Sequence, residues 1–183
     1  MIETPADSRK SYGWRFHLAG DTHTEEIKKL AEIMKGIRFA MLTTVEPDGS
    51  LHSRPMATQE VEFDGDLWFF TAAHSPKVWE TDQHRQVNVA FSDPSKNSYL
   101  SASGTAVLVR DRKKMEELWK PVLKTFFPKG LDDPELSLLK VTVEKAEYWD
   151  AASSLIGRAI NFARAYVSKD PSKLGDHAKV DLT

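Results

Sequence analysis

The sequence has no cysteine, no long apolar run and no large excess of either charge. The absence of cysteine excludes disulfides, thiolate metal sites and cysteine nucleophiles, and it fits a cytoplasmic protein. No apolar run approaches the roughly 20 residues that a membrane-spanning helix needs. Residues 1–20 contain no hydrophobic signal core, so we expect neither secretion nor membrane insertion. The net charge of −2 provides no general basic surface for nucleic acid.

The length of 183 residues fits one domain, and short apolar segments separated by turn residues dominate its middle. We expect strands at 39–45, 51–61, 67–71, 86–92, 99–110, 136–143 and 146–150. Helices are expected at about 24–35, at 76–84, after Asp111, and from Ser153 or Ser154. Many short strands, few helices and no βαβ alternation predict a mainly β fold, a small antiparallel barrel with peripheral helices. We divide the chain into a flexible N-terminal segment 1–20, a folded domain 21–167 and a polar, frayed C-terminal tail 168–183.

Each of the four expected helices carries apolar side chains, and those of the first form one helical face made of Ile27, Leu30, Ala31 and Met34. In the short helix at 76–84, Val78 and Trp79 are placed to pack inward. The helix after Asp111 has one apolar face that we expect to be buried, and Pro121 should kink or restart it. That face consists of Met115, Leu118, Trp119, Val122 and Leu123. The last helix has an apolar stripe, suited equally to a subunit interface or to its own barrel, made of Ile156, Ala159, Ile160, Ala163 and Val167.

The stretch from Ser50 to Lys77 predicts two strands, a tight turn, and a loop that opens a helix. An Asp-Gly pair at 64–65 stands between two apolar runs and indicates a hairpin. Pro55 has no N–H for a strand ladder, so its strand should lie at an edge or bulge there. Ser75 is a good N-cap, and Pro76 suits the first helical position because the N–H that it lacks has no helical partner there.

The start of this short helix predicts an anion site. A helix N-terminus offers unpaired N–H groups and the positive end of a dipole. Lys77 adds a charge beside it, and Arg54 could reach the same point with a forked donor suited to phosphate oxygens. With the hydroxyls of Thr71 and Ser75, these residues could hold one phosphate. The alternative, which spacing alone favours, is an ordinary strand Arg, an ordinary helix cap and a solvent-exposed Lys.

Seven pieces of sequence, taken in order, resemble the general stress protein family of FMN-binding split barrels, within the pyridoxamine 5'-phosphate oxidase-like superfamily. The pieces are F-A-M-L-T-T (39–44), D-G-S-L-H-S-R-P-M (48–56), L-W-F-F-T (67–71), S-P-K-V-W-E (75–80), V-N-V-A-F-S-D-P (87–94), Y-L-S-A-S-G-T-A (99–106) and E-Y-W-D (147–150). The resemblance covers roughly residues 24–150. It implies a six-stranded antiparallel split β-barrel that forms a homodimer and binds FMN in the grooves between subunits.

The resemblance also implies which residues contact the cofactor. Arg54, Pro55 and Met56 match the strand that touches the phosphate and the ring edge. The next strand and the helix start add Phe70, Thr71, Ser75, Pro76 and Lys77. Trp149 resembles an aromatic residue that family members place near the flavin, although a packing role at the barrel rim is an equal alternative. A weaker match suggests that Asn97, Ser98 and Tyr99 approach the ring from the partner subunit.

Neither a metal site nor a catalytic motif made of protein side chains alone is expected. No two of the six histidines have the i, i+4 spacing of a helical metal site, and no Ser–His–Asp or paired-carboxylate motif stands out. The resemblance therefore implies that the flavin carries any redox chemistry.

The activity itself stays open at the level of sequence. The C-terminal S-K-L-G-D-H-A-K-V-D-L-T lacks the paired Arg and His with which pyridoxamine 5'-phosphate oxidases grip their substrate, so we do not expect vitamin B6 oxidation. One hypothesis is a flavin-dependent oxidoreductase of unknown substrate. The other is a non-catalytic FMN-binding stress or regulatory protein. A split barrel that holds haem or a deazaflavin is a third.

Overall fold

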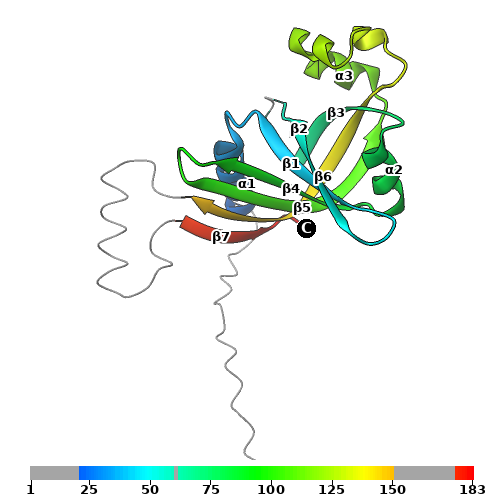
Figure 1. The fold of residues 1–183 in the computed structure, drawn as a ribbon. Coiled ribbons are helices and arrows are strands. Elements are labelled where there is room, and N and C mark those ends of the chain that lie inside the picture. Colours follow the sequence, from blue (N-terminus) through cyan, green and yellow to red (C-terminus); the bar gives the residue numbers. More distant parts are fainter. Residues whose placement is uncertain (1–20, 60–61, 151–175) are drawn as a thin grey trace, which may run out of the picture.

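The computed structural model describes residues 21–59, 62–150 and 176–183, which form one antiparallel sheet with helices around it (Figure 1). The strands are β1 Phe39–Val45, β2 Leu51–Ala57, β3 Asp66–Ala72, β4 Gln86–Asp93, β5 Ser98–Val109, β6 Leu136–Asp150 and β7 Asp176–Asp181. The helices are α1 Asp21–Met34, α2 Pro76–Gln83 and α3 Arg112–Leu118, with 3₁₀ turns η1 Pro121–Thr125 and η2 Gly130–Asp132. No helix in these ranges is long and apolar enough to cross a membrane.

The sheet curls without closing, and this confirms the predicted split barrel. Its strand order is β2-β1-β4-β5-β6-β3, so β2 and β3 form the two ends of the path. These two edge strands come into contact without pairing. The sequence predicted that the strand of Pro55 lies at an edge of the sheet or bulges there. β2 pairs only with β1, so the proline lies on an edge strand.

The predicted hairpin between the second and third strands is wrong. β2 returns along β1 through a turn in which the Glu46 N–H donates to the Ser50 carbonyl at 2.8 Å. β3 instead pairs with β6, at the opposite end of the sheet. Gly65 of the Asp-Gly pair does take the positive φ of a turn, +108°, and its carbonyl accepts from the Val143 N–H. The local turn signal was therefore real, but it did not decide which strand β3 joins.

One long strand, β6, organises the far side of the barrel. The sequence predicted two strand segments here, and they form a single strand whose free edge is shared by β3 and β7. Opposite β6 the register shifts at Gly104, the expected bend, where an added Cβ would lie 2.0 Å from the carbonyl oxygen of Thr142. The frayed tail expected over 168–183 is wrong for β7, whose Val180 is buried in the barrel core.

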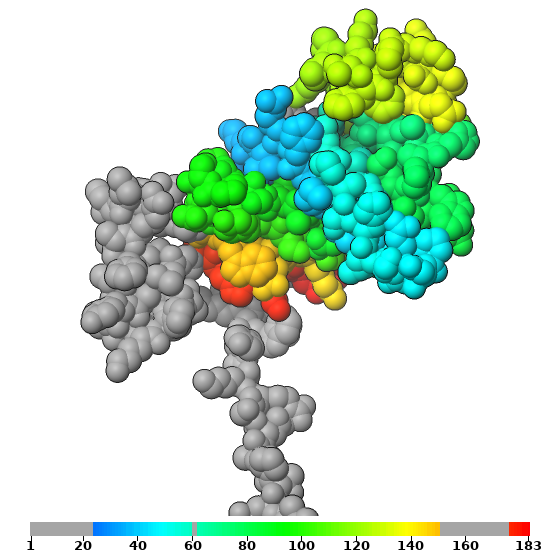
Figure 2. Space-filling view, in the orientation of Figure 1, coloured from blue at the N-terminus to red at the C-terminus, as the bar shows by residue number. Residues whose placement is uncertain are grey.

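Two apolar clusters stabilise the fold. The larger fills the barrel beneath α1, with Leu42, Val89, Leu139 and Val141 fully buried. The smaller lies beneath the segment from α3 to η2, which Figure 2 shows as a separate lobe beside β3. Its buried members are Phe70, Met115, Leu118, Leu123, Leu136 and Leu138.

The α3 segment follows its sequence signals except at one apolar position. Asp111 caps α3 by accepting from the Lys114 N–H, and the chain restarts at Pro121 as a 3₁₀ turn. Val122 is exposed, contrary to the predicted buried face, because the helix ends at Leu118 and its periodicity does not continue. The segment 1–20 and the apolar stripe expected at 156–167 lie outside the described residues.

Candidate functional site

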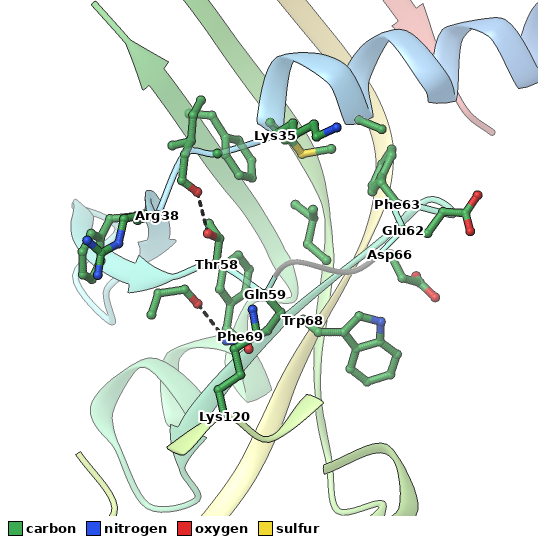
Figure 3. Close-up of a pocket in the computed structure, with 18 of the residues that line it drawn as sticks. Lys35, Arg38, Thr58, Gln59, Glu62, Phe63, Asp66, Trp68, Phe69 and Lys120 are labelled. Atoms are coloured by element: carbon green, nitrogen blue, oxygen red, sulfur yellow. Dashed lines mark hydrogen bonds between the residues drawn. The ribbon is translucent and has the colours of Figure 1, made fainter. Parts of the chain in front are cut away.

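The open edge between β2 and β3 carries a cavity near the connection that joins these strands (Figure 3). Its volume is about 920 Å³. The end of α1, the start of β1, the β2–β3 connection, β3 and η1 each contribute to its wall. The sequence did not predict this cavity, because no single segment of the chain forms it.

A polar cluster lies further along the same two strands, where β3 turns into α2. Ser75 occupies the N-cap position of α2 and Pro76 the first helical position, as predicted. The Ser75 hydroxyl makes no capping hydrogen bond. Instead it lies 3.1 Å from the Thr71 hydroxyl and accepts from the Lys77 ammonium at 3.2 Å. Three of the predicted phosphate contacts are therefore adjacent in the structure.

Arg54 reaches this cluster from β2 and forms a buried ion pair. Its Nη2 donates to the Glu80 carboxylate at 2.8 Å, and its Nη1 donates to the Thr44 hydroxyl at 2.5 Å. The Thr44 hydroxyl in turn donates to Glu80 at 2.5 Å. The side chains of Arg54 and Glu80 are 16% and 3% exposed, so both charges are largely removed from water. This network joins β1, β2 and α2.

Lys77 is close enough to Arg54 for the positive charge of Arg54 to act on its ammonium. The pKa of Lys77 is lowered, first by burial and then by the positive charge of Arg54, while Glu80 opposes the shift. The only hydrogen bond of its ammonium to a described residue is the one to the Ser75 hydroxyl. An anion placed beside Lys77 would therefore relieve an unfavourable interaction.

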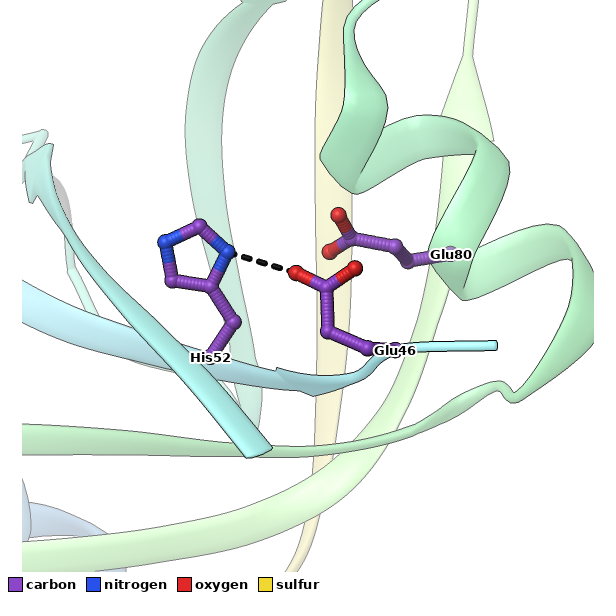
Figure 4. A group of neighbouring side chains, drawn as sticks. All are labelled: Glu46, His52 and Glu80. Atoms are coloured by element: carbon purple, nitrogen blue, oxygen red, sulfur yellow. Dashed lines mark hydrogen bonds and ion pairs between the residues drawn. The ribbon is translucent and has the colours of Figure 1, made fainter. Parts of the chain in front are cut away.

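Glu46, His52 and Glu80 form a group whose ligand atoms lie within 4.8 Å of one another (Figure 4). His52 Nδ1 lies 2.6 Å from a carboxylate oxygen of Glu46. Arg54 Nη2 lies 2.8 Å from Glu80 and 3.9 Å from Glu46, so a guanidinium already provides positive charge to both carboxylates. This arrangement is explained as an ion network. The expectation of no metal site stays a prediction.

Of the four other residues predicted to contact the cofactor, apart from Trp149, two are exposed and two are buried. Pro55 and Pro76 are exposed at the strand edge and at the helix start. Met56 is buried in the barrel core. Phe70 is buried in the smaller cluster, where its ring meets Trp119 edge-on at a centroid distance of 5.6 Å. The side chains of Met56 and Phe70 therefore pack inside the two apolar clusters, and the cofactor contacts expected of all four residues stay predictions.

Trp149 lies far from the polar cluster along β6. Thr71 pairs with Ser137 on β6, and Trp149 follows twelve residues later, up to about 40 Å along the strand. The Trp149 ring is half-exposed and stacks on His177 of β7 at a centroid distance of 5.3 Å. Its neighbour on β5 is Tyr99, which is also exposed.

The sequence analysis missed the carboxylate that organises the cluster. Glu80 is buried together with Val78 and Thr81, whereas Trp79, predicted to pack inward, is exposed. A signal was present, because Glu80 stands three residues after Lys77 and therefore on the same helix face. Burial of a carboxylate was not expected, since an unpaired one is rarely tolerated.

Comparison with known proteins places the chain in a family. Residues 25–172 match the family described as pyridoxamine 5'-phosphate oxidase like. Protein bli-3 of Neurospora crassa is 28% identical over 158 residues, and the match covers 81% of this chain and 76% of that protein. The general stress FMN/FAD binding protein of Xanthomonas citri is 31% identical with a TM-score of 0.62, covering 72% of this chain and 93% of the other. General stress protein 26 of Bacillus anthracis shares the fold at 24% identity and a TM-score of 0.59, covering 68% of this chain and 93% of the other. The chain therefore belongs to the pyridoxamine 5'-phosphate oxidase-like family and has the split-barrel fold of the general stress proteins.

Proposed function

We propose that the protein binds FMN and that the polar cluster holds the FMN phosphate. The observation that carries this proposal is the half-buried Lys77 ammonium, which lies beside a second cation and has its pKa lowered. Two cations and two hydroxyls, from Arg54, Thr71, Ser75 and Lys77, suit a dianion. The name of the Xanthomonas citri relative, an FMN/FAD binding protein, supports the choice of a flavin.

Lys77 is the stronger phosphate ligand of the two cations. Both terminal nitrogens of Arg54 already donate within the protein, to Thr44 and Glu80. A charged hydrogen bond contributes about 1.5–3 kcal/mol. Losing the Lys77 contact should therefore weaken FMN binding about tenfold or more.

The test is a titration of the purified protein with FMN and with riboflavin, which lacks the phosphate. We expect FMN to bind at least about tenfold more tightly than riboflavin. Lys77→Met should weaken FMN binding and leave riboflavin binding unchanged. Lys113→Met, at an exposed lysine of α3, serves as the matched control. Equal affinities for FMN and riboflavin in the unaltered protein would refute the phosphate site.

We further propose a homodimer that completes the site. One subunit supplies the polar cluster, while Tyr99 and Trp149 are exposed at the distant end of β5 and β6. A second copy could bring these rings over a flavin bound at the cluster, and this would account for their exposure. Light scattering should give twice the mass of the chain. Trp149→Ala should weaken FMN binding while riboflavin binding weakens equally, because the ring and not the phosphate is contacted.

We propose a flavin-dependent oxidoreductase as the activity, with storage or sensing of flavin as the alternative. The bound flavin would supply hydride and electron transfer, and the chain would bind and orient it. Rapid reduction of the flavin by NADH or NADPH, followed by reoxidation that depends on an added acceptor, would support the enzyme. Tight binding without turnover across a broad panel of acceptors would support the non-catalytic function.

A further inference from the structure

The end of the barrel against which α2 packs holds a layer of buried polar side chains. Among the described residues, six polar or charged ones are buried. One of them, Ser98, donates to Asp150 at the other end of β6. The remaining five lie in α2 or on β1, β3 and β6, and they are Thr44, Thr71, Glu80, Thr81 and Ser137. Each of these groups needs a hydrogen bond, because burying a polar group without one destabilises the fold.

Ser137 is the member of this layer that lacks a hydrogen bond. The hydroxyls of Thr44, Thr71 and Thr81 each have one. The Ser137 side chain is fully buried, and in the described part of the chain its hydroxyl is the only buried side-chain polar atom without a partner. Buried hydroxyls are nearly always paired, so the presence of this one requires an explanation.

The register of the sheet places Ser137 beside Thr71. The two residues are directly opposite each other on β6 and β3. Opposite residues of antiparallel strands point to the same face, with their Cβ atoms about 4.5–5.5 Å apart. The next pair on this face is Phe69 with Leu139, and both belong to the barrel core. Ser137 and Thr71 are therefore the polar end of a row that lines the barrel interior.

The Thr71 hydroxyl has room for a second partner when it binds an anion. A threonine hydroxyl has one proton to donate and two lone pairs that accept. It lies 3.1 Å from the Ser75 hydroxyl and 3.4 Å from the Ala72 carbonyl oxygen, to which it can donate. A phosphate oxygen would take the proton of Thr71 and leave its lone pairs to accept. Ser137 is the neighbour whose own proton has no other partner.

We propose that Ser137 is a positioning residue of the phosphate site, an inference that rests on the proposed function. With FMN bound, the Ser137 hydroxyl donates to Thr71 Oγ1, and the Thr71 hydroxyl donates to the phosphate. Ser137 thereby directs the Thr71 proton at the phosphate, and hydrogen bonds in such a chain strengthen one another. Binding pairs a hydroxyl that folding alone leaves unpaired.

Ser137→Ala should change FMN affinity and stability in opposite directions, because it removes the hydroxyl and little else. FMN affinity should fall about three- to tenfold, the value of one hydrogen bond between neutral groups, while riboflavin affinity stays within about twofold. The urea midpoint of the protein without flavin should stay the same or rise, since no unpaired hydroxyl is buried. A lower midpoint with an equal loss of FMN and riboflavin binding would show a purely structural role and overturn the proposal.

A second variant tests whether Ser137 acts through Thr71. Thr71→Val should weaken FMN binding by itself, because it removes the hydroxyl that donates to the phosphate. Adding Ser137→Ala to Thr71→Val should then change FMN affinity by less than about twofold, since the two residues form one chain of hydrogen bonds. Losses that add in the double variant would overturn the proposal, because Ser137 would then act without Thr71.

The matched controls are Ser103→Ala on β5 and Thr142→Val on β6. Both remove an exposed hydroxyl from a strand of the same sheet. Ser103 accepts from Asn88 at 3.1 Å, and Thr142 donates to Asp66 at 2.7 Å. Because neither hydroxyl belongs to the buried layer, both variants should bind FMN and riboflavin as the unaltered protein does. A loss of FMN affinity in either control as large as that in Ser137→Ala would overturn the proposal.

The role of Ser137 and the phosphate site itself fail in distinguishable ways. If Lys77→Met weakens FMN binding and Ser137→Ala does not, the phosphate site stands and the role of Ser137 is refuted. If FMN and riboflavin bind equally to the unaltered protein, the phosphate site is refuted and the role of Ser137 is refuted with it.

Discussion

The ion pair between Glu80 and Arg54 allows a sharp test of how the candidate site is held together. Glu80→Ala removes a carboxylate that accepts from Arg54 at 2.8 Å and from Thr44 at 2.5 Å. The side chain of Glu80 is almost fully buried and that of Arg54 is largely buried. The variant would therefore leave the Arg54 guanidinium shielded from water and without its counter-charge. Breaking a buried pair in this way costs about 3–5 kcal/mol. We therefore expect the free energy of unfolding to fall by that amount.

Urea denaturation monitored by tryptophan fluorescence measures this change. The control is Glu117→Ala, which removes an exposed carboxylate that pairs with Lys114 at 2.9 Å, nearly the same distance. Such an exposed pair contributes about 0–1 kcal/mol. If Glu80→Ala and Glu117→Ala destabilise the protein equally, the reasoning from burial is refuted.

A double variant distinguishes two contributions to the free energy of unfolding. One is the destabilisation from leaving Arg54 without Glu80, and the other is the net stabilisation from the ion pair itself. Arg54→Met combined with Glu80→Leu replaces both charges by apolar side chains of similar length. Replacing a buried pair as a whole is often neutral or stabilising. We expect the double variant to be more stable than Glu80→Ala and to bind FMN more weakly than the unaltered protein. A double variant less stable than Glu80→Ala would show that the pair itself stabilises the fold.

Three further predictions concern the stability of β5, α3 and β6. Gly104→Ala should lower the free energy of unfolding by about 1–3 kcal/mol or more, because its Cβ would lie 2.0 Å from the Thr142 carbonyl oxygen. Asp111→Ala should cost about 1 kcal/mol in thermal unfolding through the lost cap of α3. Asp150 is partly buried, which raises its pKa, but hydrogen bonds from Lys29 and Ser98 outweigh burial, and its pKa is lowered below 3.8. Ionised Asp150 therefore stabilises the fold at a pH above its pKa in the unfolded chain, and this stabilisation is lost as the pH falls through the lowered pKa of the folded protein. Lys29→Met removes one cause of the lowered pKa, so the free energy of unfolding should fall less steeply below about pH 4.

Each of these predictions has an outcome that would contradict it. An alanine at Gly104 that leaves the unfolding curve unchanged would mean that β5 can move away from β6 at little cost. Equal melting temperatures for Asp111→Ala and the unaltered protein would show that α3 does not depend on its cap. An acid-unfolding curve that Lys29→Met does not alter would show that another carboxylate controls acid stability.

The sequence predicted those features that depend on neighbouring residues. The bounds of β1 and α2 and the restart at Pro121 followed from alternation, a proline at a helix start and a helix-breaking residue. The association of Thr71, Ser75 and Lys77 was predictable for the same reason, since one strand end and one helix start carry all three.

The features that sequence did not predict depend on distant parts of the chain. β7 is polar along most of its length, and a single buried residue, Val180, joins it to the barrel. Glu80 of α2 is tolerated inside because Arg54, from β2, neutralises it. The cavity is assembled from the wall segments of α1, β1, β3 and η1. In each case the deciding partner lies far away in sequence, where local spacing carries no information.

The wrongly predicted hairpin explains why the candidate sites lie where they do. Had β2 paired with β3, a ladder of backbone hydrogen bonds would fill the space that now separates them. Because β3 pairs with β6 instead, two strand edges face each other, and unpaired edges must be covered or interrupted. Pro55 interrupts one edge, and the ion pair of Arg54 with Glu80 ties it to α2. The polar cluster and the cavity occupy what remains of this open edge, so the topology that leaves the barrel split also leaves open the edge on which both lie.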